Sequence, residues 1–312
     1  MLSLNKLSGT VNRLCRNYLS RSLTSISNEN AEVKEQKEKN ILTDHYNGVA
    51  IISINRPDKK NCLDVATTQE LVEELDKFDN DEKSVVGVLH GVGGNFCGGY
   101  DLKEIAQYNG TNEEILPQFG PLGDKIELCK KPLIAAINGY AVGVGFELAL
   151  MCDLRVMEES AVMGFLNRRY GIPILCGGTV RLPALIGYSR AMEVILTGRA
   201  IFAKEAFNWG LANRYTVPGA VIGTAVNLAK SLVKFPQKVM LADRASANYA
   251  TFSAKQLEEA LQFEKNNSSH LLFEDGVNGA KRFVAEGLGK HGKFYDITPQ
   301  DMTIDELDKN LL

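Results

Sequence analysis

The chain has 312 residues, of which 45% are hydrophobic and 23% are charged, and its formal net charge is −3. This composition is close to the average of globular proteins and excludes disordered, collagen-like and coiled-coil chains. The sequence contains no run of about 18 apolar residues, so we expect no membrane-spanning helix. A chain of this length forms one large domain or two small ones and can enclose a pocket.

The amino-terminal segment 1–28 differs in composition from the rest of the chain. It is rich in serine and leucine, contains no acidic residue, and carries four basic residues, Lys6, Arg13, Arg16 and Arg21. This pattern is typical of a mitochondrial transit peptide, and the alternative is an ordinary tail. Residues 29–41 alternate in charge with little apolar content, which indicates a solvated linker. The sequence therefore predicts a protein of the mitochondrial matrix.

The middle of the chain alternates between strand and helix patterns. Short runs of β-branched and aliphatic residues predict strands at 49–55, 84–90, 133–137 and 154–157. Asp64 is a typical N-cap residue and precedes an amphipathic helix at 65–78, and a further helix is expected at 147–151. This order indicates an α/β core, which we place at 42–215.

The C-terminal part is predicted to be mainly helical. Helices are expected at 189–197, 203–209, 219–234, 236–249, 253–266 and 274–286, with one short strand at 213–216. We therefore assign residues 216–312 to a C-terminal helical region, which is either a second layer or an oligomer interface.

Three glycine-rich segments follow predicted strands, among them 91–99 and 139–145. None contains G-x-G-x-x-G or the P-loop pattern, which argues against a nucleotide site. The six cysteines and four histidines show no metal-binding spacing, and we expect no metal. Glycines also let a backbone approach a ligand closely, with its N–H groups free to donate.

Two of these loops lead into predicted helices. Asp101 is expected to cap the helix that follows Gly98 and Gly99, with Glu104 completing a capping box. The second loop places Glu147 in the first turn of the next helix. If the loops face one another, they form an oxyanion hole with an acid/base group beside it. Taken alone, each loop is more often an ordinary turn before a helix.

Six segments in this order resemble the crotonase (enoyl-CoA hydratase/isomerase) family. They are 55–63 (NRPDKKNCL), 95–102 (NFCGGYDL), 138–149 (NGYAVGVGFELA), 151–155 (MCDLR), 177–182 (GGTVRL) and 196–198 (LTG). The resemblance covers residues 42–295. It implies a crotonase-like ββα-spiral core with a C-terminal helical trimerisation region, in a homotrimer or a dimer of trimers. It also implies acyl-CoA substrates, with CoA present only as part of the thioester and no separate cofactor.

The resemblance further assigns site residues. The two backbone amides that hold the thioester oxygen in this family match Gly98 and Val144. Glu147 matches the first of two acid/base glutamates, and the second matches Asn167, whose amide cannot transfer a proton. CoA is expected along two segments, which comprise Asn61, Cys62, Leu63, Gly98, Gly99, Tyr100 and Asp101.

The expected function is that of an enoyl-CoA hydratase-like lyase in mitochondrial fatty-acid or branched-chain acyl-CoA metabolism. Glu147 is its acid/base residue. Because the second carboxylate is missing, an isomerase, a decarboxylase or an acyl-CoA hydrolase remains an alternative, as does a non-catalytic CoA- or RNA-binding relative. The chain beyond the basic leader is acidic and lacks a patch of basic and aromatic residues, which argues against nucleic-acid binding.

Overall fold

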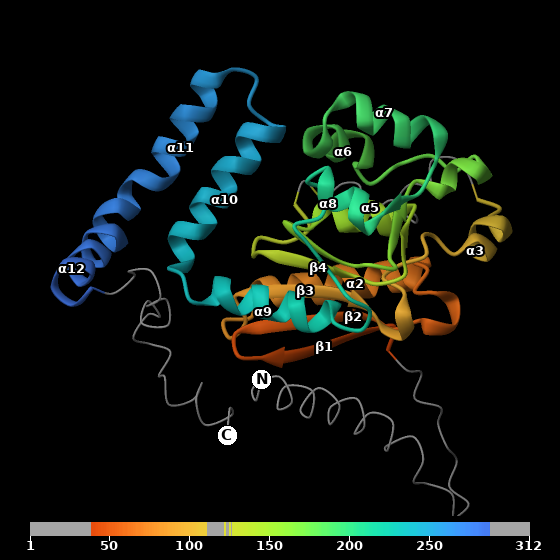
Figure 1. Cartoon of the computed structure of the whole chain (residues 1–312), viewed down its shortest axis with the longest axis horizontal. Helices are drawn as coiled ribbons and strands as arrows, with labels where there is room; N and C mark the ends of the chain where they lie inside the picture. Colours follow the sequence, from red (N-terminus) through yellow and green to blue (C-terminus); the bar gives the residue numbers. More distant parts are fainter. Residues whose placement is uncertain (1–38, 111–121, 123–124, 126, 288–312) are drawn as a thin grey trace, which may run out of the picture. The chain divides into compact units, whose positions relative to one another are not determined.

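The computed structural model describes residues 39–110, 122, 125 and 127–287 (Figure 1). The predicted transit peptide, most of the linker and residues 288–312 lie outside this range. The strands are β1 (Ile41–Tyr46), β2 (Val49–Ile54), β3 (Val86–Gly91), β4 (Leu133–Ile137), β5 (Tyr140–Val142), β6 (Leu154–Glu158), β7 (Val162–Gly164), β8 (Ile201–Phe202) and β9 (Arg214–Thr216). The α-helices are α2 (Val65–Asn80), α3 (Leu102–Gln107), α5 (Val144–Met151), α6 (Gly178–Ile186), α7 (Tyr188–Thr197), α8 (Ala203–Asn208), α9 (Val221–Val233), α10 (Gln237–Phe252), α11 (Leu257–Leu271) and α12 (Val277–Glu286). Short 3-10 helices are η1 (Pro57–Lys59), η2 (Val92–Gly94) and η3 (Leu166–Tyr170), and η4 (Leu272–Gly276) is a π-helical turn.

The main sheet has the strand order β1-β2-β3-β4-β6-β9. β1 pairs antiparallel with β2, and every other pair in this sheet is parallel. A smaller sheet contains β5, β7 and β8. All residues of β3 and β4 are buried, as expected for central parallel strands that are covered on both faces. The predicted α/β class is confirmed.

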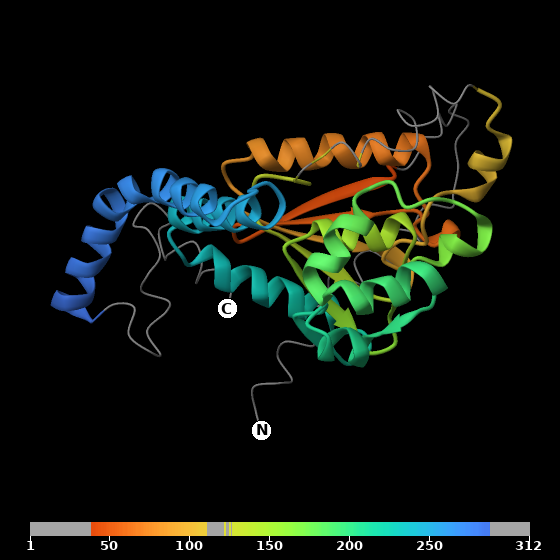
Figure 2. The same cartoon turned by 90° about the horizontal axis from the view of Figure 1, so that it is seen from above.

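Alternating residues of the central strands contribute to two separate hydrophobic clusters. Val86 and Val88 pack with α9 on one face of the sheet, whereas Leu89 belongs to the larger cluster on the other face. This follows from the two-residue period of a strand. The larger cluster also contains apolar residues of α2 and α5, and Figure 2 shows α2 and α9 on opposite sides of the main sheet.

The packing of the core continues beyond the predicted boundary at 216. α9 lies beyond it in sequence, yet its residues Val221, Ala225, Ala229 and Val233 are buried against the sheet. These positions repeat every fourth residue and therefore form one face of the helix. The core thus extends through α9, and the separate helical region begins with α10.

The helices that follow α9 confirm a helical C-terminal region. α10 and α11 pack against each other, and Asn267 Nδ2 of α11 donates a hydrogen bond of 2.9 Å to the Ala242 carbonyl of α10. Arg244 of α10 donates to Asp153 at 2.7 Å and to Glu127 at 3.2 Å, which attaches the helix to the core. No helix within the described ranges is both long and apolar enough to cross a lipid bilayer.

Three loops meet at one edge of the main sheet. They follow β2, β3 and β4, which are parallel neighbours and end at Ile54, Gly91 and Ile137. Because parallel strands have their carboxyl ends at the same edge, the glycine-rich loops are brought together there. Isolated bridges join Leu63 to Tyr100 and Cys97 to Ala141, so the loops pair with one another through their backbones.

Candidate active site

Asn61 links the loop that follows β2 to the loop that follows β3. It adopts a left-handed conformation with φ of 57° and is completely buried. Its Nδ2 donates to the carbonyls of Val92 and Asn95 at 2.8 and 2.6 Å, and its Oδ1 accepts from the Arg56 N–H at 2.8 Å. The side chain is therefore fully occupied by loop contacts.

The segment 98–101 is hydrogen-bonded to the chain on both sides of Asn61. The Gly98 N–H donates to the Lys60 carbonyl at 2.9 Å. The Leu63 N–H donates to the Gly99 carbonyl, and the Asp101 N–H donates to the Leu63 carbonyl, both at 2.8 Å. The Gly98 amide hydrogen is thus committed within the loop, and the expectation that Gly98 donates to a thioester oxygen is wrong.

The Tyr100 N–H lies on the side of segment 98–101 that faces away from Leu63. The C=O and N–H of a trans peptide point to opposite sides, and no described peptide is cis. Because the Gly99 carbonyl points at Leu63, the Tyr100 N–H points away from Leu63, toward the loop before α5. Gly99 has a φ of 100°, and a Cβ there would lie 3.1 Å from the Val142 carbonyl oxygen. This close approach brings the two loops into contact.

The loop that follows β4 leads through β5 directly into α5. Gly143 adopts a φ of 57°, and its N–H donates to the Gly164 carbonyl at 3.0 Å. Val144 is the first residue of α5, where an amide has no acceptor within the helix. A Cβ on Gly145 would lie 2.4 Å from the Cys97 carbonyl oxygen, so only glycine lets α5 approach the loop after β3 this closely.

Asp101 caps α3, as predicted, with its carboxylate accepting from the Lys103 N–H at 3.2 Å. The predicted capping box with Glu104 is wrong. Glu104 Oε2 instead accepts from the Val65 N–H, at the start of α2, at 3.0 Å. Sequence spacing cannot reveal this bond because its partners are 39 residues apart.

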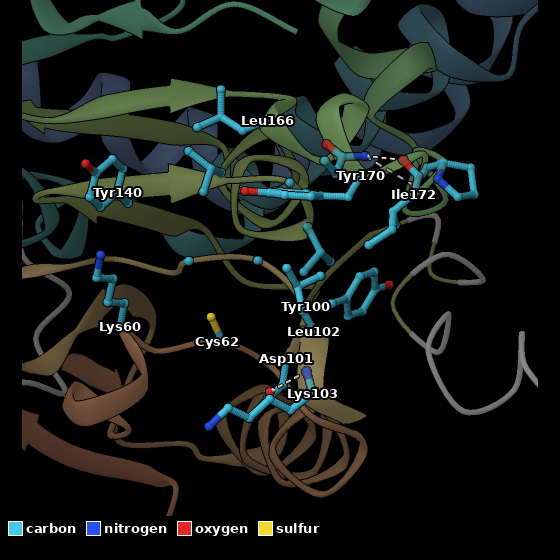
Figure 3. Close-up of a pocket in the computed structure, with 17 residues that line it drawn as sticks. Lys60, Cys62, Tyr100, Asp101, Leu102, Lys103, Tyr140, Leu166, Tyr170 and Ile172 are labelled. Atoms are coloured by element: carbon cyan, nitrogen blue, oxygen red, sulfur yellow. Dashed lines mark hydrogen bonds between the residues drawn. The ribbon is translucent and has the colours of Figure 1, made fainter. Parts of the chain in front are cut away.

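A cavity of about 440 Å³ lies between these loops and the segment after β7 (Figure 3). Seven of the predicted site residues line it: Cys62, Gly98, Gly99, Tyr100, Asp101, Val144 and Asn167. Asn61 and Leu63 are completely buried and do not line it, and their predicted contact with CoA stays a prediction. Glu147 does not line it either.

The cavity wall also includes residues that the sequence did not assign. Figure 3 shows Tyr140, Leu166 and Tyr170 on one side of the cavity and Cys62 and Asp101 on the other. Lys60 and Lys103 lie on the same side as Cys62 and Asp101. The Lys60 Nζ lies 5.2 Å from the centroid of the Tyr140 ring. The wall thus combines apolar and aromatic groups with two cations, as expected for a ligand that has both apolar and anionic parts.

Glu147 is buried behind the cavity wall with only 1% of its surface exposed. Its Oε2 accepts from the N–H groups of Cys176 and Gly178, at 2.6 and 2.9 Å, where α6 begins. Burial raises the pKa of this carboxyl, and the backbone donors together with Arg181 offset part of the effect. The Tyr100 hydroxyl lies 3.5 Å from Cys176 Sγ, so Tyr100 connects the cavity to the surroundings of Glu147.

Asn167 lines the cavity next to Gly143, in the loop before α5. Its Nδ2 donates to the Ile172 carbonyl at 2.7 Å, which fixes the orientation of the amide. Its Oδ1 has no hydrogen-bond partner and lies close to Gly143. Asn167 thus has a buried acceptor without a partner, and it has no titratable proton.

The described part of the chain contains no cluster of His, Cys, Asp and Glu that could hold a metal ion.

Comparison with known proteins identifies this arrangement of loops. A sequence model described as enoyl-CoA hydratase/isomerase matches residues 44–289. The chain belongs to the enoyl-CoA hydratase/isomerase family. It is 34% identical over 212 residues to a short-chain-enoyl-CoA hydratase of Clostridium acetobutylicum, covering 66% of this chain and 80% of that protein. It is 32% identical over 247 residues to a probable mitochondrial enoyl-CoA hydratase of Dictyostelium discoideum, covering 78% and 87%.

A crystal structure of an enoyl-CoA hydratase from Bacillus anthracis has the same fold. It superposes with a TM-score of 0.73 at 33% identity, over 78% of this chain and 96% of that chain. The expected crotonase fold is thereby confirmed, and the family acts on CoA thioesters.

The contacts of Glu147 predict different effects for two substitutions. Glu147→Ala leaves two buried N–H groups without an acceptor, and each such loss costs about 1–3 kcal/mol. We expect the free energy of unfolding to fall by about 3 kcal/mol for Glu147→Ala and by about 1 kcal/mol for Glu147→Gln, which keeps an acceptor oxygen. Urea denaturation measures both values. Equal losses would show that the contacts with Cys176 and Gly178 do not stabilise the fold.

Proposed function

We propose that this enzyme is a hydratase-like lyase that adds water to, or removes it from, the α,β bond of an acyl-CoA thioester. The observation that carries the proposal is the convergence of two loop amides on one cavity. The Tyr100 N–H is turned away from Leu63, and the Val144 N–H opens α5; both residues line the cavity.

In this proposal the thioester oxygen lies between the Tyr100 and Val144 amides. Attack of water at Cβ moves an electron pair through the double bond onto that oxygen, forming an enolate. Fixed N–H groups stabilise the developing charge, and the positive end of the α5 dipole adds to their effect. Losing one such donor typically costs about 3 kcal/mol of transition-state stabilisation. Tyr100 replaces Gly98 as the first donor, and Val144 remains the second.

Glu147 serves as the acid/base group: it takes a proton from the water that attacks Cβ and returns a proton to Cα as the enolate collapses to the product thioester. It lies three residues after Val144, so both residues are on the same side of α5. Proton exchange with the substrate passes Tyr100, whose side chain reaches from the cavity wall to Cys176 beside Glu147. Asn167 presents its Oδ1 as an acceptor for the water or the product hydroxyl, and it cannot replace the second carboxylate.

The direct test is incubation of the full-length protein with crotonyl-CoA, with mass spectrometry to detect a water adduct. We expect the adduct with the wild type and at least about a hundredfold slower formation with Glu147→Gln, because general acid–base catalysis contributes about 10²–10⁴-fold. The folded state of the variant is checked by circular dichroism. Tight binding of the thioester without any adduct would contradict the proposed lyase activity.

The raised pKa of Glu147 gives a second prediction. As a general base in hydration, Glu147 must be ionised, so a raised pKa removes the active form at a higher pH than usual. We expect the acidic limb of kcat/KM for crotonyl-CoA hydration to lie above pH 4.5, the ordinary value for a glutamate. Samples returned from each pH to pH 7 control for irreversible inactivation. An acidic limb at or below 4.5 would contradict the assignment.

Decarboxylation of an acyl-CoA that carries a carboxylate on Cα is a second candidate. It needs the same enolate-stabilising amides but no general base in the step that breaks the C–C bond. The burial of Glu147 and the amide at Asn167 favour it. Release of CO₂ from methylmalonyl-CoA, unchanged in Glu147→Gln, would support this reaction over hydration.

We also propose that the chain assembles into homotrimers, singly or in pairs. The helices α11, η4 and α12 expose large apolar side chains, among them Leu257, Leu261, Leu272, Phe273, Phe283 and Val284. Multi-angle light scattering should give three or six times the chain mass of 34.3 kDa, and Phe273→Glu should lower it. A wild-type monomer would contradict this assembly.

The matrix of mitochondria is the proposed location. The acid-free basic segment 1–28 and the similarity to a probable mitochondrial hydratase support it. A fluorescent protein carrying residues 1–28 should be imported into mitochondria. A diffuse cytosolic signal would contradict a targeting role for this segment.

A further inference from the structure

Arg56 lies beneath the cavity, next to the segments that build it. Its side chain is 8% exposed. The Nη1 donates to the Cys62 carbonyl, and the Nη2 contacts the carboxylates of Asp64 and Asp101 at 2.6 and 3.2 Å. Arg56 does not line the cavity. We therefore look for its effect in the segments that it contacts.

We propose that Arg56 is a positioning residue that fixes the direction of the Tyr100 amide and thereby the polarisation of the bound thioester. This inference rests on the oxyanion site of the proposed function. It does not depend on which reaction follows enolate stabilisation.

The first step of the argument is that Arg56 holds both partners of the pairing between the loops. Leu63 pairs with Gly99 and Asp101 through two hydrogen bonds of 2.8 Å. Arg56 binds the carbonyl immediately before Leu63 and the carboxylate of Asp101. The guanidinium therefore bridges the two backbones on either side of these hydrogen bonds.

The second step concerns the peptide between these anchors. The Gly99–Tyr100 peptide is oriented by the Leu63 N–H, and a relative shift of the two segments tilts this peptide plane. An oxyanion donor must be placed within fractions of an ångström to act on the developing charge. The planar fork of an arginine can hold several acceptors in a fixed arrangement, whereas a lysine ammonium acts as a compact point charge.

The third step separates Arg56 from the other cation on Asp101. Lys59 Nζ lies 3.2 Å from the same carboxylate oxygen, but its side chain is 53% exposed. An exposed ion pair contributes little, because water screens it and the long side chain loses entropy. Arg56 is almost fully buried and bonds to both segments, so it is the cation expected to set their geometry. Lys59 supplies a matched control.

The experiment measures the carbonyl stretch of bound [1-¹³C]butyryl-CoA by isotope-edited infrared difference spectroscopy with the full-length protein. This saturated thioester has no double bond to hydrate, so the band reports polarisation without turnover. We expect the band to move to lower wavenumber on the wild type and on Lys59→Gln. Arg56→Lys should lose about half of that shift or more, with its Kd changed by less than about threefold.

A full shift in a folded Arg56→Lys protein would overturn the proposal, as would an equal loss in Lys59→Gln. If Arg56→Lys does not fold, Asp101→Asn breaks the same bridge while its Oδ1 still accepts from the Lys103 N–H, and it should also lose the shift. An absent shift in the wild type would overturn both the oxyanion site and the role of Arg56. A wild-type shift that Arg56→Lys loses, together with no water adduct on crotonyl-CoA, would support this proposal and contradict only the lyase assignment.

Discussion

The geometry of the site depends on a short backbone pairing between Leu63 and the segment from Gly99 to Asp101. Two hydrogen bonds join loops that follow different strands of the main sheet. They determine which amide of the glycine-rich loop faces the cavity, because each trans peptide directs its C=O and N–H to opposite sides. Asn61 and Arg56 are buried polar groups whose hydrogen bonds maintain this pairing. Neither residue lines the cavity, so the catalytic proposal depends on residues that support the loops.

Glu147 illustrates how one side chain can have structural and chemical roles. Its carboxylate accepts hydrogen bonds from the N–H groups of Cys176, just before α6, and Gly178, the first residue of α6, which would otherwise be buried donors without this acceptor. The same burial raises its pKa and thus favours proton exchange closer to neutral pH. In the proposed mechanism Tyr100 controls access to this carboxyl, because it fills the wall between the cavity and Cys176.

Much of the fold could be predicted from the sequence because its local signals agree. The apolar runs of β3 and β4, the N-cap at Asp64 and the glycines before α5 each indicate an element that the structure contains. The boundary of the core could not be predicted, since α9 resembles the helices that follow it and only its packing on the sheet distinguishes it. Likewise, sequence brought Gly98 and Val144 together as donors, but the hydrogen bond from Gly98 to Lys60 depends on loop pairing that spacing does not encode. Tyr140 and Ile172 were missed because an isolated tyrosine or isoleucine gives no local signal of a cavity.

The central claim is that the Tyr100 and Val144 amides hold the thioester oxygen. A crystal structure of the full-length protein with butyryl-CoA tests it most directly. The account predicts that the thioester oxygen lies about 2.7–3.1 Å from both amide nitrogens, the range required of oxyanion donors, while the Gly98 N–H remains bonded to Lys60. A thioester oxygen bound by the Gly98 amide, or one that contacts neither Tyr100 nor Val144, would contradict it.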